Sequence, residues 1–439
     1  MDRRHFAKSA VAGLVLLGSG RAFAQDTSGD EFDGLEPAFL DEIDALNETG
    51  TRAQITVLGD KIDFSKIPDV ADQIIRSQVV AEAQNGKKAY AQLPEALLPK
   101  WPAVDKAPDY FYMAGYKPSA PEFRLTGALL DQLAENNSFK LPGTPGGPAD
   151  FMPIVPFGLR GCEIADQSPM KPFAAEQALR VVEPSHRETR CVMGVWDRAR
   201  NQISVYRAST LPSGIEAFMA LRAGGYGASL LPTGLYDYKV GVHNARKAGR
   251  GADQPGALVH LGDYIVLRTA KDLVFDPYAA TTGWTHGAAH NVHSSGTSHS
   301  LQNFDSAGCQ VVCGWYSGQY DQRAAIGNWA QFQRDAGLAS AAGKPLSSGP
   351  KYKYLLLTGL EAALYQQSAD FQDYYKQLGL LRPGSSGHQV ASRKTRLLKR
   401  DTVSNVFDAE TTIAVLEQYK ASPKYNEYAS HIYTRNLDQ

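Results

Sequence analysis

Short apolar runs bounded by turn residues fill the middle of the chain, whereas helical periodicity is confined to its flanks. In the middle, runs rich in Val, Ile, Leu and Tyr predict strands at residues 191–196, 203–207, 235–242, 257–261 and 264–268. The polar segment 197–201 joins the first two runs and Gly262-Asp263 joins the last two, so each pair is predicted to form a β-hairpin. Repeated strands and hairpins predict a mostly antiparallel β domain, either a sandwich or a barrel.

Apolar residues at helical spacing predict helices on both sides of this β domain. They fall at residues 32–46, 67–84 and 124–136 before it, and at 320–336 and 360–365 after it. A short strand is expected at 352–358, and the segment 93–121, rich in proline and aromatic residues, is expected to be irregular. The predicted fold class is therefore α+β, with helical regions flanking the β-sandwich or β-barrel.

The chain is long enough for two or three domains. Its 439 residues, of which 43% are hydrophobic, contain ample material for a buried core. The stretch 141–148, rich in proline and glycine, is the clearest loop between regions. The predicted divisions are a leader, a mainly helical region, the β domain, a helical connection, a helical module and a tail, at residues 1–24, 25–150, 151–318, 319–378, 379–420 and 421–439.

The leader has the features of an export signal. Arg3-Arg4 in a basic start, a weakly apolar run at 10–17 and the small-x-small site Ala22-Phe23-Ala24 resemble a twin-arginine signal. The formal net charge of −1 does not favour nucleic-acid binding. No apolar run reaches the ~18 residues that span a bilayer. We therefore expect a periplasmic protein without a stable membrane anchor.

Candidate chemistry is concentrated in residues 284–313. Cys309 follows a turn of small residues, Ser306-Ala307-Gly308, and His293 lies on an apolar-flanked run upstream. The thiolate is the attacking form of cysteine, and a neighbouring imidazole is the usual way to generate it near neutral pH. Small residues let the backbone turn tightly, so that amide N–H groups can face a developing oxyanion. This composition predicts a thiol–imidazole nucleophile.

The same stretch resembles the active site of the L,D-transpeptidase (YkuD-type) family, over roughly residues 190–315. The family has a His-Gly or His-Ser on a strand, a Ser-His-Gly-Cys turn and an upstream Pro-x-Gly-x-Tyr. The matching segments are His293-Ser294, Ser306-Ala307-Gly308-Cys309 and Pro232-Thr233-Gly234-Leu235-Tyr236. Ala307 replaces the second histidine of the family, and Gln310-Val311 stands where an apolar residue followed by Arg or Asn is usual.

This resemblance implies roles for particular residues and a particular reaction. The implied catalytic residues are Cys309, His293, Ser306 and Gly308, and the implied substrate contacts are Ser294, His290, Ala307, Gln310 and Tyr236. Ser306 is expected to bond either the imidazole or the turn backbone, and His290 either to support the site or to be a solvated loop residue. The implied activity is cross-linking of peptidoglycan stem peptides, through 3-3 or 1-3 links, by a cysteine thioester and without a cofactor.

A second resemblance lies near the C-terminus, at residues 381–415. The pattern formed by Gly384-Ser385-Ser386-Gly387 and the later Phe407-Asp408 resembles the sequence pattern of a small three-helix peptidoglycan-binding module. Asp408 is expected to cap the helix that carries Ala414 and Val415. Arg393-Lys394 departs from the module's usual Leu-Gln, so a plain helical tail is the alternative.

Several histidines in the central stretch raise a metal site as a rival hypothesis. Its ligands would be His286, His290 and His293, completed by Asp305 or Cys309. On a strand, however, His290 and His293 point to opposite faces, which disfavours a shared ion. We therefore expect no metal.

The four cysteines bear on the remaining alternatives. In an oxidising compartment Cys162 and Cys191 are candidates for a disulfide, whereas we expect Cys309 to be a free thiol and Cys313 to be buried. A Cys309–Cys313 disulfide would instead suit a non-catalytic wall-binding protein. An L,D-carboxypeptidase or endopeptidase using the same residues with water is the other alternative. The oligomeric state and the stem composition are not indicated by the sequence.

Overall fold

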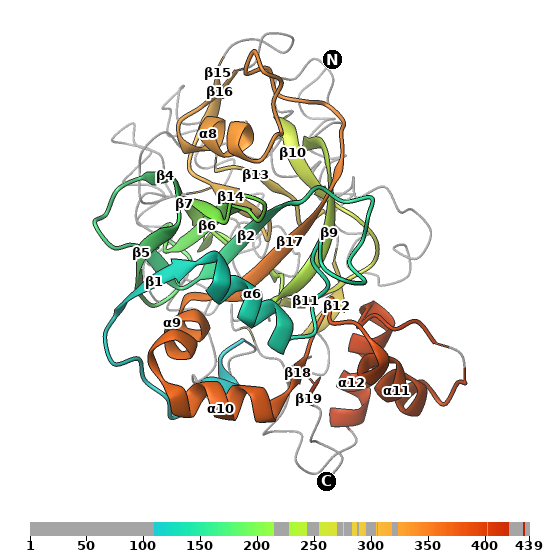
Figure 1. Cartoon of the computed structure of the whole chain (residues 1–439). Helices are drawn as coiled ribbons and strands as arrows, with labels where there is room; N and C mark the ends of the chain where they lie inside the picture. The colour runs from blue at the N-terminus through green and yellow to red at the C-terminus, as the bar shows by residue number, and fades with distance from the viewer. Residues whose placement is uncertain are drawn as a thin grey trace, which may run out of the picture.

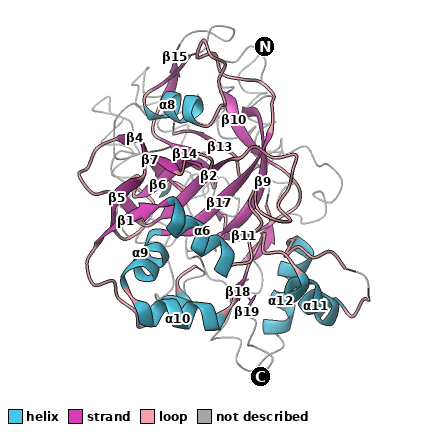
Figure 2. Cartoon of the chain, viewed as in Figure 1, coloured by secondary structure: helices cyan, strands magenta, loops and turns pink. Residues whose placement is uncertain are grey.

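The computed structural model describes most of the chain from residue 109 onward. The described residues are 109–214, 228–243, 254–269, 275, 283–287, 289–295, 304, 306–317, 324–401, 403–420 and 433–434. The expected export signal and the helices predicted at 32–46 and 67–84 lie outside them. Within the described residues, strands outnumber the six α-helices, so the fold is α+β with strands predominating (Figure 2).

An eight-stranded β-barrel forms the centre of the molecule (Figure 1). Its strands, in order around the barrel, are β14 (Gln310–Val312), β13 (Val292–Ser294), β10 (Gln254–His260), β9 (Gly234–His243), β17 (Lys351–Thr358), β2 (Ile154–Arg160), β6 (Cys191–Asp197) and β7 (Gln202–Ser209). All neighbours are antiparallel except the pairs β13–β14 and β17–β2. Of the two predicted arrangements, sandwich or barrel, the chain adopts the barrel.

The barrel closes because β14 pairs with β13 on one side and with β7 on the other. β14 bonds the last residues of β7, Ala208 and Ser209, while β4 (Met170–Ala174) bonds the earlier part of the same edge. Two short strands thus share one long edge, and only β14 continues around the ring.

Smaller sheets and helices surround the barrel (Figure 1). The sheets are β1 (Glu122–Thr126) with β5 (Glu176–Val181) and β3 (Cys162–Ile164); β12 (Trp284–His286) with β11 (Ile265–Arg268) and β8 (Ser229–Leu230); β15 (Trp315–Ser317) with β16 (Ala324–Ile326); and β18 (Leu380–Leu381) with β19 (Tyr433–Thr434). The helices are a 3₁₀ turn, η5 (Phe111–Met113), and α6 (Gly127–Asn136), α8 (Asn328–Asp335), α9 (Gly359–Gln367), α10 (Ala369–Leu378), α11 (His388–Leu398) and α12 (Ala409–Lys420). None of the helices in the described residues is both long and apolar enough to cross a membrane.

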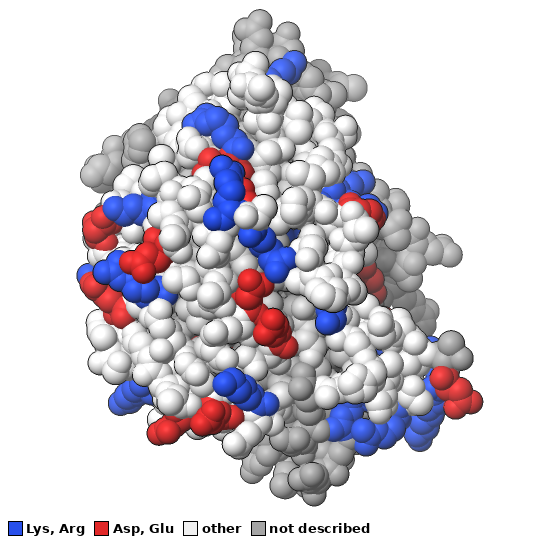
Figure 3. Space-filling model, viewed as in Figure 1, with Lys and Arg blue, Asp and Glu red and all other residues white. Residues whose placement is uncertain are grey.

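Strand β17 separates two hydrophobic clusters because successive side chains of a strand point to opposite faces. Leu355 and Leu357 pack in the cluster that includes α6, α9 and α10. Tyr354 and Leu356 pack in the other cluster, together with Trp329 of α8. Both faces of β17 are buried, which explains its nearly continuous apolar sequence. Charged side chains of both signs are interspersed over the visible face (Figure 3).

Several predicted elements are confirmed. The hairpin at 191–207 is formed by β6 and β7, and the strand at 352–358 and the following helix are β17 and α9. The hairpin around Gly262 is wrong. β10 pairs with β9 and β13, and β11 pairs with β12 and β8, so the turn at Gly262, whose φ is 78°, carries the chain from the barrel into another sheet.

Two predicted helices begin later than expected. Phe123 and Leu125 alternate with exposed residues to form β1, and the Thr126 hydroxyl then accepts a hydrogen bond from Leu129 N at 3.1 Å and caps α6. In the second case β16 precedes the helix, and Gly327, with φ 74°, turns the chain into α8. The described part of the N-terminal region, from residue 109, contains one α-helix, so a mainly helical region there is not confirmed.

The C-terminal helices α11 and α12 pack around a small core of their own, with Val390, Phe407 and Val415 among its members. Asp408 accepts a hydrogen bond from Thr411 N at 3.0 Å, which confirms the predicted cap. Lys394 of α11 is buried and pairs with Asp408.

Two buried ion pairs fasten the segments around the start of β9. Arg160 of β2 pairs with Asp109, and Arg382, which follows β18, pairs with Glu361 of α9. Thr233 joins them, because its hydroxyl contacts Asp109 Oδ1 at 2.9 Å and Arg382 Nη1 at 2.8 Å. All four charged side chains are fully buried, so each depends on its counter-ion.

All four cysteines are free thiols. Cys162 and Cys191, the candidate pair for a disulfide, are therefore not bonded to each other. Each of these two thiols has a separate contact: Cys162 Sγ donates to Leu159 O at 3.4 Å, and Cys191 Sγ accepts from Thr210 Oγ1 at 3.3 Å. Cys309 is free and Cys313 is buried, as expected.

Candidate active site

The turn before β14 is held by its own serine and by two neighbouring segments. Ser306 Oγ donates to Cys309 O at 2.7 Å and accepts from Gly308 N at 3.2 Å. Ser306 O accepts from Ser213 N at 2.6 Å, and Ala307 O accepts from Ser229 N at 2.9 Å. Of the two roles considered for Ser306, its hydroxyl thus takes the one on the turn backbone, and the turn is anchored from both sides.

Gly308 is required by close packing and not by a left-handed backbone. A Cβ atom at this position would lie 2.6 Å from His290 Nε2 and 2.8 Å from Ser229 O. Gly308 is not among the described glycines with positive φ. Gly308 is therefore needed for the close approach of His290 and Ser229, a different reason from the tight backbone turn that the sequence predicted.

Cys309 and His293 are brought together by the parallel pair β13–β14. His293 is paired with Val311 in register, and Gln310 N donates to Asn291 O at 2.8 Å, so Cys309 lies beside the residues that lead into β13. A ring nitrogen of His293 and Cys309 Sγ lie within 4.8 Å of each other. The side chain of Cys309 is largely buried, at 8% exposure.

The imidazole of His293 is fixed in one tautomer. Its Nδ1 donates to Ser294 O at 2.7 Å, because a carbonyl oxygen can only accept. Nε2 therefore carries the lone pair in the neutral ring, and it is buried without a hydrogen-bond partner among the described residues. Burial lowers the pKa of His293 from 6.5 to about 4, so the ring is neutral at pH 7. A neutral imidazole beside a thiol, fixed in orientation and with Nε2 able to accept a proton, has the chemistry of a general base.

The thiol itself is held by a strained residue. Cys309 Sγ donates to Ala289 O at 3.1 Å. Ala289 has φ 52°, in the left-handed region that costs a non-glycine residue about 1 kcal/mol. The strained conformation of Ala289 thus places its carbonyl oxygen at the sulfur. The S–H group must rotate away from this oxygen before it can donate its proton to His293.

His290 supports the turn instead of lying in a solvated loop. Its side chain is buried, its N–H donates to Tyr264 Oη at 2.9 Å, and its Nδ1 shares a hydrogen bond with the same oxygen at 2.9 Å. Tyr238 Oη donates to His290 O at 2.6 Å. Two tyrosines therefore hold His290 with its Nε2 edge against Gly308.

The other residues expected to contact substrate make internal contacts. Ser294 Oγ donates to Gln254 Oε1 at 2.7 Å, and Gln310 Nε2 donates to Gly308 O at 3.2 Å. Tyr236 is buried in the barrel cluster and donates to Pro232 O at 2.8 Å. Ala307 contributes its carbonyl group to the turn, as described above, and its side chain is half-buried.

The residues proposed for a metal site do not all come together. His286 is exposed and its Nδ1 lies 2.8 Å from Asp263 Oδ1, and Asp305 is outside the described residues. The group that does converge is His243, His293 and Cys309, whose potential ligand atoms lie within 4.8 Å of one another. The two rings are stacked at 3.9 Å with an interplanar angle of 6°, so their in-plane lone pairs cannot converge on one ion without rearrangement. This geometry suits proton transfer better than chelation.

The sequence hypothesis missed His243, Tyr264 and Asn291. His243 is the last residue of β9, one position beyond the run of alternating residues that predicted this strand. Asn291 lies directly between His290 and Val292 but was not singled out. The alternation of β9 does not reveal it, because His243 falls on the same face of the strand as Asp237 and Lys239, and its burial comes from packing at the end of the strand.

Comparisons with protein-family models, with curated proteins and with solved structures find no match to this chain.

Proposed function

We propose that this chain is an exported cysteine L,D-transpeptidase that cross-links the peptide stems of peptidoglycan. The observation that carries the proposal is the oriented set of Cys309 thiol, His293 imidazole and Ser294 carbonyl, with Nε2 as the acceptor. Cys309 is a free thiol, as this chemistry requires. The twin-arginine-like start of the sequence supports export to the periplasm, and the helices α11 and α12 are proposed to be the peptidoglycan-binding module.

In the proposed reaction, the Cys309 proton passes to His293 Nε2 as the sulfur attacks the carbonyl next to an L-centre of the donor stem. The resulting oxyanion is proposed to be held by backbone N–H groups of the turn. The C–N bond then breaks, the leaving amine takes the proton from His293, and a thioester remains. An amine on a second stem attacks the thioester and restores the thiol.

Burial of the nucleophile favours transfer over hydrolysis. Cys309 and His293 are at most 8% exposed, so a bound donor stem would leave little room for water at the thioester. The L,D-carboxypeptidase or endopeptidase alternative uses the same residues with water as the acceptor. The proposal for a non-catalytic wall-binding protein requires the thiol to be tied up, which the free Cys309 does not support.

The test is incubation of the full chain with purified muropeptides, followed by mass spectrometry of the products. Cys309→Ala is compared with Cys313→Ala, because Cys313 has the same 8% exposure and lies four residues further along the same strand region. We expect a cross-linked dimer, of mass equal to two stems minus the leaving group, from the wild type and Cys313→Ala but not from Cys309→Ala. Fragmentation assigns a 3-3 or a 1-3 link.

The other outcomes are equally informative. A shortened monomeric muropeptide whose formation depends on Cys309 would indicate hydrolysis in place of transfer. Unchanged muropeptides with every variant, together with retention of the protein on insoluble peptidoglycan, would replace the enzyme by the wall-binding alternative.

A further inference from the structure

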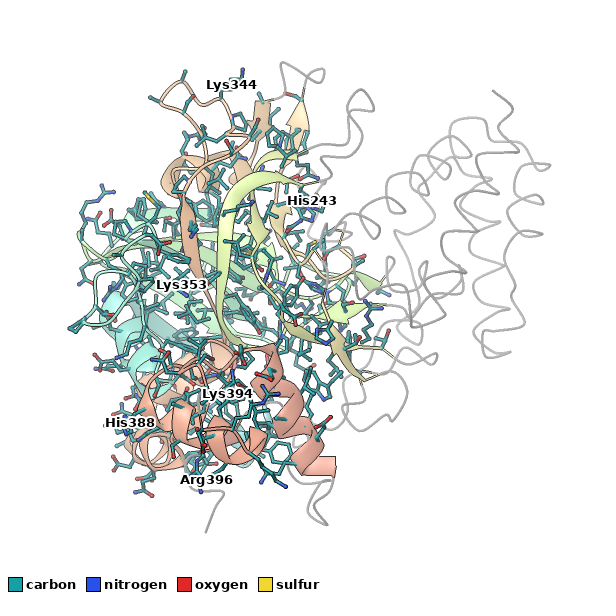
Figure 4. The ribbon with its side chains drawn as sticks, turned by 90° about the vertical axis from the view of Figure 1, so that its right-hand side faces the viewer. His243, Lys344, Lys353, His388, Lys394 and Arg396 are labelled. Carbon is teal, nitrogen blue, oxygen red and sulfur yellow. The ribbon has the colours of Figure 1, made fainter. Side chains whose placement is uncertain are left out.

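His243 is a second imidazole at the candidate active site, contributed by a distant part of the sequence. It is the last residue of β9, and its ring stacks on that of His293 with centroids 3.9 Å apart and planes 6° apart. Both side chains are almost completely buried. Figure 4 shows His243 at the end of β9 far from α11, on which Lys394 and Arg396 are labelled.

An amide side chain fixes the orientation of His243. Asn291 Oδ1 accepts the hydrogen bond of His260 N at 3.1 Å, so the NH₂ group of Asn291 is the end that faces His243 Nδ1, at 3.1 Å. Nδ1 of His243 is therefore an acceptor, and the neutral ring carries its proton on Nε2. The two stacked rings consequently have opposite tautomers, because His293 carries its proton on Nδ1.

The stacked pair of neutral rings can take up at most one additional proton. Two imidazolium charges at this separation would repel each other in a buried site. Burial, and then the charge of His293, lower the pKa of His243 well below its usual value, whereas the pKa of His293 falls only to about 4. A proton taken from Cys309 therefore stays on His293, and the flat face of a neutral ring lies against the cation that forms.

We propose that His243 is a positioning residue for His293: its flat ring clamps the plane of the neighbouring imidazole and so holds Nε2, which has no hydrogen-bond partner among the described residues, in place to accept the proton of the Cys309 thiol. Without this ring, His293 would be held by one hydrogen bond, from Nδ1 to Ser294 O, which permits rotation of the ring about that bond. The inference rests on the proposed function for its catalytic readout but not for its chemical one. In the step concerned, the S–H bond of Cys309 breaks, the proton moves to Nε2 of His293, and His243 exchanges no proton.

The experiment compares two replacements of His243 in the full chain, one with a flat aromatic side chain and one with a branched aliphatic side chain. His243→Phe keeps a flat ring on His293, and His243→Leu fills the space without one. The first readout is the rate at which iodoacetamide alkylates Cys309 at pH 7, followed by peptide mass spectrometry, which separates Cys309 from the other three thiols; Cys313→Ala is the control for labelling at the nearest thiol in the sequence. The second is kcat and KM in the muropeptide reaction. Thermal unfolding verifies that each variant is folded.

We expect His243→Leu to lower the alkylation rate and kcat by about 10- to 100-fold, with KM changed by less than about threefold, because displacement of a general base affects the transition state more than substrate binding. We expect His243→Phe to remain within about threefold of the wild type in both readouts. If His243→Leu does not fold, His243→Gln takes its place, since it keeps a polar contact to Asn291 but has no ring.

Two results would overturn the inference. A wild-type alkylation rate in the folded Leu or Gln variant would show that no clamp is needed, and an equally slow Phe variant would show that the imidazole nitrogens matter and the flat ring does not. If no protein, including the wild type, cross-links muropeptides but the alkylation rates differ as expected, the proposed function fails and the positioning role stands.

Discussion

Replacing His186 by glutamine is expected to reduce the sensitivity of the fold to acid. His186 is buried, its Nδ1 donates to Pro212 O at 2.8 Å, and its ring stacks on Phe275 at 5.6 Å. Burial lowers the pKa of His186 from 6.5 to about 4, against the opposing effect of the hydrogen bond to Pro212 O. The segment matters to the candidate site because Gly214 N donates to His186 O, next to Ser213, which anchors the turn that carries Cys309.

The magnitude follows from the two pKa values. Between pH 6.5 and 4 the unfolded chain binds a proton at this histidine and the folded chain does not. The free energy of unfolding is therefore unaffected by His186 above pH 6.5 and decreases as the pH falls below that value. At about 1.36 kcal/mol per pKa unit, His186 removes about 2 kcal/mol of stability by pH 5 and about 3 kcal/mol by pH 4. Below pH 4 the loss levels off, because both states are then protonated.

The assay is urea unfolding of the wild type and His186→Gln at intervals from pH 7 to pH 4. Glutamine keeps a donor for Pro212 O but does not titrate, so the free energy of unfolding of the variant should fall less steeply. From pH 7 to pH 4, the free energy of unfolding of the wild type should fall by about 3 kcal/mol more than that of the variant. Parallel curves would refute the reasoning, since they would mean that His186 has the same pKa in the folded and unfolded chains.

Three further predictions concern the site and the buried ion pairs. Gly308→Ala should lower the free energy of unfolding by about 1–3 kcal/mol and slow alkylation of Cys309, because its Cβ would lie 2.8 Å from Ser229 O; unchanged urea midpoints and rates would contradict this. Protonation of His293, with a pKa of about 4, should make kcat/KM level from pH 7 to about 5 and half-maximal near pH 4, and a limb near pH 6.5 would contradict its burial. Arg382→Met should cost about 3–5 kcal/mol by leaving the Glu361 carboxylate uncompensated, and adding Glu361→Leu should recover part of the loss; additive losses in urea unfolding would contradict a coupled pair.

Local patterns in the sequence predicted the local parts of the fold. The polar turn between β6 and β7 was sufficient to predict their hairpin, and the apolar run of β17 was sufficient to predict a strand. Both predictions depend only on residues that are close together in the sequence. The pattern failed at Gly262, where a turn residue between two apolar runs is equally compatible with a hairpin and with a crossing into another sheet. Which of these forms depends on strands that are distant in the sequence.

The candidate site divides in the same way. Cys309, Gly308 and Ser306 lie in one turn, so their association could be predicted from spacing, and His293 could be predicted from the resemblance. His243 could not, because its position on the imidazole depends on the register of β9, β10 and β13. The reason for Gly308 was also hidden, since His290 and Ser229 reach it only in the folded barrel.

The site lies at the seam where the barrel closes, which explains why its parts are so scattered in the sequence. β14 is the strand that pairs with both β13 and β7, and Cys309 immediately precedes it. The parallel pairing of β13 with β14 places the thiol beside the strand that carries His293, and β10 links that strand to β9 and its terminal His243. Because the nucleophile, the base and the stacked ring come from three strands, none of the proposed chemistry is available to a chain in which this seam is open.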